Sequence, residues 1–194
     1  MTIIHPQSQQ PLPDHAEKVF SGEIFDVYQW QQEMYDGSFV TFEKLKRADT
    51  VVIFAVTNDG RIVLTRQEQP GKQPFIAAAG GRVDPGEDIL DAAKRELLEE
   101  TGYTSNDFQF WRSFQPIGKI EWSIYFFIAR NVTRVQNQEL DAGEKIDVME
   151  VTFDEFLTYA MDPEFIDKEI YRDVVEATID EQKMQELKTF FLGS

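Results

Sequence analysis

The pattern of apolar and polar positions predicts strands along most of the chain, beginning with a hairpin. Residues Val19 to Lys46 alternate on both sides of Tyr35-Asp36-Gly37-Ser38, and Asp-Gly between alternating segments is a strong hairpin signal. A β-branched run from Thr50 to Val56, the turn Asn58-Asp59-Gly60 and the alternating segment Arg61 to Arg66 predict two paired strands of a core sheet. A small antiparallel sheet should therefore precede a larger one.

Helical periodicity is confined to later segments. A helix is predicted from about Asp88 to Thr101, because Leu90, Ala93 and Leu97 form one apolar stripe and Gly102 is the expected stop. The order of elements predicts an α/β fold in which helices cover a mixed sheet. The other expected elements are strands at Phe108 to Phe114, Ser123 to Ala129 and Ile146 to Phe153, and helices near Asp154 to Met161 and Asp167 to Phe191.

Length and composition indicate one globular unit. The chain has 194 residues, of which 42% are hydrophobic, so it can fill a single core, and no internal repeat divides it. Prolines and glutamines near the start predict a flexible leader over residues 1–16. The N-terminal sheet is expected over 17–48, and the main domain with its C-terminal helices over 49–194.

Charge and the absence of cysteine exclude several functions. The 19 basic and 35 acidic residues give a net charge of −16, which argues against binding of long nucleic acid. Without cysteine there is no thiol nucleophile, thiolate zinc site or disulfide, and a cytoplasmic location is expected. The first residues do not resemble a signal peptide, and no apolar run is long enough to suggest a membrane partner.

Three carboxylates on the predicted helix are spaced for a metal ion. Glu96, Glu99 and Glu100 project to one side of a helix, close enough to repel one another. A hard divalent cation such as Mg²⁺ takes oxygen ligands from carboxylates and substrate phosphates, and it can activate a water molecule. Glu87 can reach the same cluster from the preceding loop, and Arg95 can orient Glu96 through an ion pair. For the acidic triplet alone, a solvated amphipathic helix is the alternative.

The segment from Gly81 to Tyr103 resembles the signature of the Nudix hydrolases. It follows Gly-x5-Glu-x7-Arg-Glu-U-x-Glu-Glu-x-Gly-U, where U is a bulky aliphatic residue, and Tyr103 is the single departure. The resemblance implies a Nudix-type α/β/α sandwich with a mixed β-sheet, and Mg²⁺ as cofactor, which Mn²⁺ can replace. It also implies catalytic roles for Glu99 and Arg95, and a metal site formed by the Gly80 carbonyl, Glu96, Glu99 and Glu100 with Glu87 nearby.

Outside the signature, Val19 to Tyr159 is most similar to the branch of ADP-ribose pyrophosphatases and nucleoside diphosphate sugar hydrolases. In that branch a small N-terminal sheet is commonly shared across a homodimer, so a homodimer is expected here. Pro116 lies fourteen residues after Gly102, as is frequent in the branch. The chain departs from the usual residues of the branch at Glu68, Ala77, Ala79 and Gly118.

The loop from Leu140 to Ile146 occupies the place where members of this branch often carry a catalytic base, which makes Glu144 the candidate. His5 and His15, the only histidines, fall in the leader. The general base is therefore expected to be a carboxylate or a metal-bound hydroxide. An ordinary role as a loop carboxylate is the alternative for Glu144.

Candidate substrate contacts come from aromatic and basic residues. Tyr28 and Trp30 on the hairpin are suited to stack on a nucleobase, and Arg47 and Arg66 are suited to meet phosphates. Pro116 begins a further candidate substrate loop. For Tyr28 and Trp30, the alternative is that their rings are buried in the protein core and do not contact the substrate.

These observations predict Mg²⁺-dependent hydrolysis of a diphosphate linkage in a small nucleotide, either ADP-ribose or another nucleoside diphosphate sugar. The products would be a nucleoside monophosphate and a sugar phosphate. One alternative is a nucleoside triphosphate diphosphatase that releases pyrophosphate. The other is a non-catalytic ligand sensor with a Nudix fold, against which the intact Glu96, Glu99 and Glu100 argue.

Overall fold

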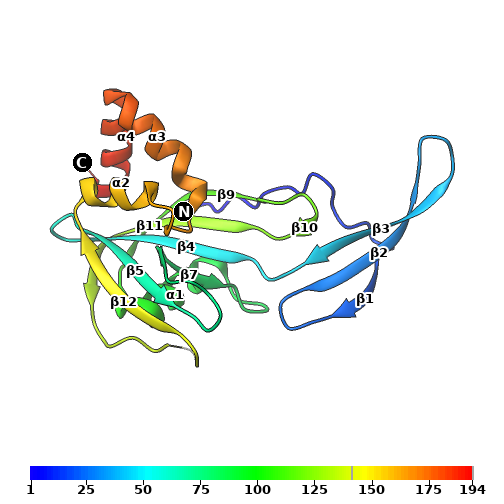
Figure 1. The fold of residues 1–194 in the computed structure, drawn as a ribbon, viewed down its shortest axis with the longest axis horizontal. Coiled ribbons are helices and arrows are strands. Elements are labelled where there is room, and N and C mark those ends of the chain that lie inside the picture. Colours follow the sequence, from blue (N-terminus) through cyan, green and yellow to red (C-terminus); the bar gives the residue numbers. More distant parts are fainter. Residues whose placement is uncertain (141, 194) are drawn as a thin grey trace.

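Two β-sheets lie side by side along an elongated molecule, and helices pack only against the larger sheet (Figure 1). The structure is a computed structural model that describes residues 1–140 and 142–193. Within these residues, no helix has both the length and the apolar character needed to cross a membrane. The smaller sheet, whose three N-terminal strands are drawn in blue, projects away from the helices.

The N-terminal hairpin is confirmed and belongs to a four-stranded sheet. Its strands are β1 (Glu17–Ser21), β2 (Asp26–Glu33) and β3 (Phe39–Lys46), and Gly37 makes the turn with a φ of 81° that glycine tolerates best. The fourth strand, β10 (Ile120–Glu121), comes from the main part of the chain and pairs in parallel with β3. The two sheets are thus connected by the β3–β4 link and also by β10, which is far from β3 in the sequence.

The larger sheet has eight strands with the order β12-β5-β4-β11-β8, while β6 pairs with β5, β7 with β4 and β9 with β11. The central pair, β4 and β11, is parallel and the other pairs are antiparallel, so the sheet is mixed as expected. Its strands are β4 (Thr50–Thr57), β5 (Ile62–Glu68), β6 (Phe75–Ala77), β7 (Ala79–Arg82), β8 (Tyr103–Thr104), β9 (Asp107–Phe114), β11 (Ile124–Arg134) and β12 (Lys145–Val151).

Side-chain alternation on the central strands creates two cores. On β4, Ile53 packs with the core beneath helix α1 (Ile89–Thr101), whereas its neighbour Phe54 packs with the opposite core. On β11, Phe127 and Phe126 divide in the same way. The opposite core is covered by α2 (Phe153–Met161), α3 (Tyr171–Ile179) and α4 (Glu181–Leu192), with the short 3₁₀ helix η1 (Lys168–Ile170) between α2 and α3. The α/β/α sandwich is confirmed.

Three predicted boundaries are wrong for local reasons. The last helical segment is not continuous, because Asp180 has an extended backbone and its side chain accepts hydrogen bonds from the first amides of α4. Strand β12 ends at Val151, because Thr152 forms a capping box with Glu155 that starts α2. Strand β11 runs past Ala129, because the register shift that follows lets pairing with β4 resume at Val132.

A buried lysine joins the leader to the smaller sheet. Lys44 on β3 has a side chain with 0% exposure, and its ammonium lies 2.6 Å from the Glu121 carboxylate on β10. The same ammonium donates to Ser8 Oγ at 2.8 Å and to the Gln10 carbonyl at 2.6 Å. Farther along the leader, His5 Nδ1 lies 2.9 Å from the Tyr125 hydroxyl on β11. Several leader residues therefore have defined partners on the main body.

Candidate active site

Helix α1 carries the signature carboxylates and is capped at both ends by its own sequence. Asp88 accepts a hydrogen bond from Leu90 N at 2.8 Å, and Gly102 ends the helix with a φ of 75°. A Cβ at Gly102 would lie 2.2 Å from the Gln136 carbonyl oxygen, so only glycine fits. Burial of Ala93 and Leu97 against the sheet fixes the rotation of the helix.

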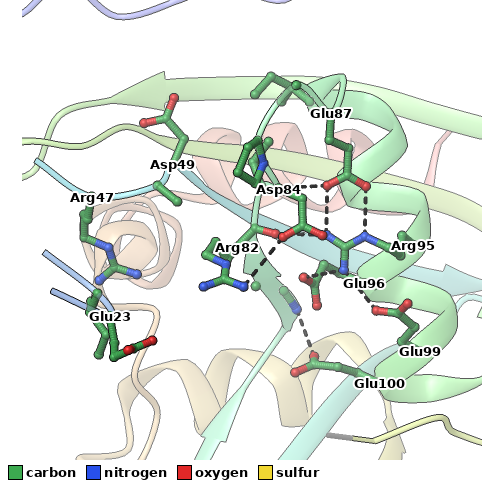
Figure 2. A pocket seen from close by; sticks show the side chains of 18 of the residues that line it. Glu23, Arg47, Asp49, Arg82, Asp84, Glu87, Arg95, Glu96, Glu99 and Glu100 are labelled. Carbon is green, nitrogen blue, oxygen red and sulfur yellow. Dashed lines mark hydrogen bonds and ion pairs between the residues drawn. The ribbon is translucent and has the colours of Figure 1, made fainter. Parts of the chain in front are cut away.

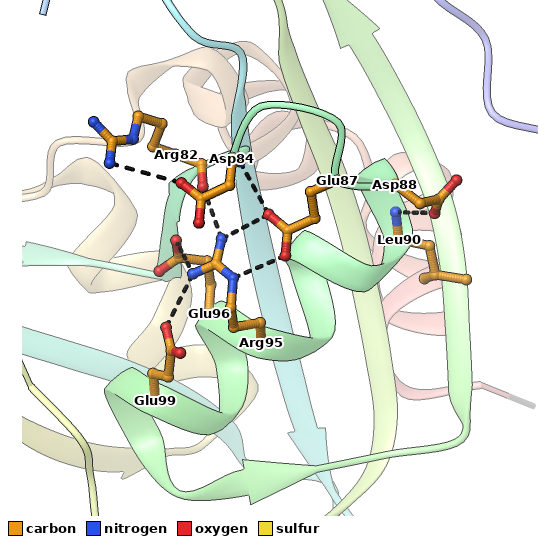
Figure 3. A network of polar contacts seen from close by, with 8 residues as sticks. All are labelled: Arg82, Asp84, Glu87, Asp88, Leu90, Arg95, Glu96 and Glu99. Atoms are coloured by element: carbon orange, nitrogen blue, oxygen red, sulfur yellow. Dashed lines mark hydrogen bonds and ion pairs between the residues drawn. The ribbon is translucent and has the colours of Figure 1, made fainter.

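Arg95 is the centre of an ion-pair network between α1 and the loop that precedes it (Figure 3). Its guanidinium binds Glu87 through two parallel hydrogen bonds of 2.8 and 2.9 Å. The same group reaches Glu96 at 2.8 Å, Glu99 at 2.9 Å and the Arg82 carbonyl at 2.9 Å. The hydrogen bonds with Glu87 raise the pKa of Arg95 and lower that of Glu87. Arg95 thus holds three carboxylates together, in line with the orienting role predicted for it.

Glu100 is the most deeply buried of the signature carboxylates, with 7% exposure. One oxygen accepts a hydrogen bond from Gly80 N at 2.9 Å, and Gln67 Nε2 lies 3.5 Å from the other. Burial raises the pKa of Glu100 to about 8, the hydrogen bond from Gly80 opposes this, and the charges of Glu96 and Glu144 add to it. Among the residues that the structure describes, no arginine or lysine forms an ion pair with Glu100 as Arg95 does with Glu96 and Glu99.

Glu96 lies directly against the glycine-rich strand β7. A Cβ at Gly81 would come within 2.5 Å of the Glu96 carboxylate, so the missing side chain leaves the space that this carboxylate fills. Burial raises the pKa of Glu96, while Arg95 lowers it and the charges of Glu99 and Glu144 raise it further. An uncompensated negative potential therefore remains between α1 and β7.

These residues line a cavity of about 1270 Å³ (Figure 2). Gly80 and the four signature glutamates lie on one side, together with Glu144 from the loop before β12. The predicted base and the predicted metal ligands are therefore brought together by elements far apart in the sequence. The remaining wall is built by the β1–β2 turn and by the link from β3 to β4.

The side of the cavity opposite the signature carboxylates carries two arginines among acidic side chains. In Figure 2 Arg47 and Arg82 lie across the cavity from Glu99 and Glu100. The Arg47 guanidinium stacks 4.5 Å from the Trp122 ring, and its buried Nε has no hydrogen-bond partner among the described residues. Burial and the charge of Arg82 lower the pKa of Arg47. An anionic group of a ligand would relieve both the missing hydrogen bond and the repulsion between the arginines.

The other predicted substrate contacts are not among the residues that line this cavity. Trp30 is 5% exposed and packs edge-on against Phe42, and Tyr28 has the Lys18 ammonium 5.8 Å from its ring. Arg66 pairs with Glu164 at 3.2 Å. Pro116 is exposed. For these four residues a substrate role stays a prediction.

Three lining residues were missed by sequence reasoning. Glu23 and Asp49 come from the β1–β2 turn and the β3–β4 link, and Arg82 lies within the signature itself. Arg82 was detectable as a basic residue at a variable signature position, flanked by Gly81 and the acidic turn. For Glu23 and Asp49 no local pattern signals a position in the cavity, because the approach of the small sheet to the main domain places them there.

The donor set fits a hard divalent cation. All candidate ligands are oxygen atoms, and burial of Glu96 and Glu100 beside further carboxylates favours either a proton or a metal ion. Among residues 1–140 and 142–193, no three acidic or histidine side chains converge closely enough to bind an ion as they stand. Arg95 contacts one oxygen of Glu96 and one oxygen of Glu99, so each carboxylate keeps a second oxygen that Arg95 does not bind.

The fold and this site define a Nudix hydrolase. Residues 46–174 match the model of the NUDIX domain, and the chain belongs to that family. It is 31% identical over 144 residues to an ADP-ribose pyrophosphatase of Bacillus subtilis (strain 168), covering 73% of this chain and 78% of that protein. It is also 29% identical over 155 residues to a methanol dehydrogenase activator of Bacillus methanolicus, covering 78% and 84%.

A solved structure supports the fold assignment. The crystal structure of an ADP compounds hydrolase superposes with a TM-score of 0.69 at 21% identity, covering 92% of this chain and 98% of that one. The resemblance to Nudix hydrolases, expected from the signature, and the resemblance to ADP-ribose pyrophosphatases, expected from the residues outside it, are both confirmed.

Proposed function

We propose that the protein hydrolyses the diphosphate linkage of ADP-ribose or another nucleoside diphosphate sugar, with Mg²⁺ or Mn²⁺ as cofactor. The observation that carries this proposal is the two-sided cavity, in which buried carboxylates face the arginine pair Arg47 and Arg82. A diphosphate is best neutralised by cations on more than one side, and a metal ion at the signature carboxylates and arginine on the opposite side would supply them.

The signature carboxylates Glu96, Glu99 and Glu100 would hold the metal, with the Gly80 carbonyl as a further ligand. A bound divalent ion supplies charge neutralisation of the diphosphate and activation of a water molecule. Arg95 orients Glu96 and Glu99 by a hydrogen bond to each, and Glu87 fixes Arg95 through both carboxylate oxygens. Glu87 is therefore better placed to orient Arg95 than to bind the metal directly.

Glu144 is the proposed general base. It lines the cavity, and its negative charge contributes to the raised pKa of both Glu96 and Glu100. A carboxylate in that place can accept a proton from the attacking water while Arg47 holds an anionic group of the substrate. Similarity to a Bacillus subtilis ADP-ribose pyrophosphatase supports the choice of substrate class.

A substrate panel tests the proposal. Purified protein with Mg²⁺ or Mn²⁺ is expected to convert ADP-ribose to AMP and ribose phosphate. Release of pyrophosphate from nucleoside triphosphates, without turnover of sugar nucleotides, would refute it in favour of a triphosphate diphosphatase. Binding of a sugar nucleotide without hydrolysis would favour a ligand sensor. Glu99→Gln should lower kcat by a factor of about 100 or more while the melting temperature stays near that of wild type.

We also propose that the N-terminal sheet forms a homodimer. Several apolar side chains on this sheet are more than 45% exposed, which is costly for an isolated subunit. They are Val19, Phe20, Ile24, Phe39 and Val40. Sedimentation of wild type and of Phe20→Glu tests this, because the charged variant should sediment as a monomer; identical dimers would refute it. The cytoplasmic location stays a prediction.

A further inference from the structure

The segment that follows β11 donates hydrogen bonds to carbonyls at the C-terminal end of α1, the helix that carries the signature. The last carbonyls of a helix have no partner within the helix and must find donors elsewhere. Here Val135 N donates to the Gly102 carbonyl at 2.9 Å, and Glu139 N donates to the Glu99 carbonyl at 2.8 Å. The segment is therefore bonded to the same turn of α1 that presents the catalytic carboxylates.

One side chain extends this connection to the next strand. Gln138 Nε2 donates to the Glu100 carbonyl at 2.6 Å and to the Ile146 carbonyl at 3.0 Å. The two hydrogens of a single amide thus join the end of α1 to the start of β12. Gln138 is half-buried, so these bonds are partly shielded from water.

Glu144 lies in the chain between Gln138 and Ile146, two residues before the carbonyl on β12 that the Gln138 amide reaches. The backbone on each side of the proposed base is consequently tied to one amide group. A shift of either Gln138 or Ile146 would change the distance from Glu144 to the carboxylates on α1.

We propose that Gln138 is a positioning residue that sets the place of Glu144 relative to the carboxylates of α1. The inference rests on the proposed function only in taking Glu144 as the base. Gln138 touches two carbonyl oxygens, and neither the signature nor the loop pattern marks it. Because small displacements of a catalytic group reduce rates strongly, a loosened loop should slow the reaction without weakening substrate binding.

Gln138→Met is the informative variant, because methionine keeps the length of the side chain and removes both N–H donors. Gln136→Met is the matched control, since Gln136 lies in the same segment and, among the described residues, its side-chain amide donates only to the exposed Glu139 side chain, at 3.0 Å. We expect Gln138→Met to lower kcat by about 10- to 100-fold, with KM and the Mn²⁺ dissociation constant unchanged. The control should match wild type.

A structural readout accompanies the kinetics. Hydrogen exchange of backbone amides over residues 142–148 should be faster in Gln138→Met than in Gln136→Met and wild type. Unchanged exchange with unchanged kcat would refute the role of Gln138. A loss confined to Mn²⁺ affinity would also refute it, because the amide would then act through the metal ligands.

A double-mutant cycle separates this inference from the assignment of Glu144. If Gln138 acts through Glu144, Gln138→Met should have no further effect on kcat in the Glu144→Gln background. An equal loss in that background would overturn the inference and leave Glu144 as the base. Wild-type turnover by Glu144→Gln would overturn both, because no base would then be positioned.

Discussion

The carboxylate of Glu96 occupies the space that a side chain at residue 81 would need. A Cβ on Gly81 would lie 2.5 Å from the carboxylate carbon and from both oxygens of Glu96. The obstructing atoms are the far end of a flexible side chain, so they can move at little cost to the fold. The carboxylate, however, cannot stay in its position on the cavity wall.

Gly81→Ala should therefore separate folding from activity. We expect a melting temperature close to that of wild type, with kcat and Mn²⁺ affinity each reduced by about tenfold or more. Gly80→Ala is the comparison, because a Cβ there would lie 2.2 Å from the Val51 carbonyl oxygen on the adjacent strand. The backbone of Val51 is held in the sheet and cannot move aside. Gly80→Ala should therefore lower the free energy of unfolding by about 3 kcal/mol. Equal melting temperatures for the two variants would contradict this account.

Metal ions should stabilise the protein more at pH 8 than at pH 6. Burial raises the pKa of Glu100 to about 8, so in the metal-free protein this ligand is largely protonated at pH 6 and must lose its proton to bind a cation. The rise in melting temperature caused by Mn²⁺, measured by thermal shift against a chelated sample, should grow with pH over this window. In Glu100→Gln the rise should be small at both pH values. A pH-independent rise in wild type would contradict the role of Glu100.

A buried aspartate outside the cavity should make stability pH-dependent in the opposite sense to an ordinary ion-paired carboxylate. Asp167 is 9% exposed, accepts a hydrogen bond from Ala78 N at 2.7 Å, and has a pKa raised by burial from 3.8 to about 7. Between these values the folded state binds more protons than the unfolded state, so the free energy of unfolding falls as pH rises from about 4 to 7.

Asp167→Asn removes the ionisation and keeps an oxygen for Ala78 N. Urea unfolding should show the variant more stable than wild type at pH 8 and close to it at pH 4. Asp154→Asn, on the exposed start of α2, should leave the pH profile of wild type unchanged. A parallel profile for wild type and Asp167→Asn would show that Asp167 does not titrate in this range.

Trp122 should influence substrate binding through Arg47. Its ring lies 4.5 Å from the guanidinium, and its Nε1 donates to Thr50 Oγ1 at 2.9 Å, which fixes the ring. Trp122→Leu removes the stacking surface, so KM should rise about tenfold with little change in kcat. Trp111→Leu removes a similar Trp–Arg stack, 4.1 Å from Arg112, far from the cavity. That control should lower the melting temperature and leave KM unchanged, and equal KM values for both variants would disprove the link.

The parts of the fold that the sequence predicts are those determined by neighbours in the chain. The limits of α1 follow from the Asp88 cap and from Gly102, and the hairpin turn follows from Asp36-Gly37. The break at Asp180 was missed because its cap interrupts a segment whose apolar periodicity continues on both sides. The pairing of β10 with β3 was missed because it comprises two residues joined across a long stretch of chain.

The candidate site, too, has one part that the sequence predicts and one part that it does not. The spacing of Glu96, Glu99 and Glu100 on one helix predicts their common side, and the structure places them on the same cavity wall. The partnership of Arg47 with Trp122 depends on a contact between residues 75 positions apart, which no periodicity encodes. Gln138 is likewise recognisable only from the two carbonyls that its amide reaches.

The buried ammonium of Lys44 gives the first ten residues an influence on the substrate cavity. Its three partners are a carboxylate on β10, a serine hydroxyl and a backbone carbonyl, and two of the three belong to the leader. Trimming the leader would remove two of the three partners of Lys44, which lies three residues before Arg47 in the chain. We expect the choice of N-terminal boundary in an expressed fragment to affect the wall of the cavity that carries Arg47.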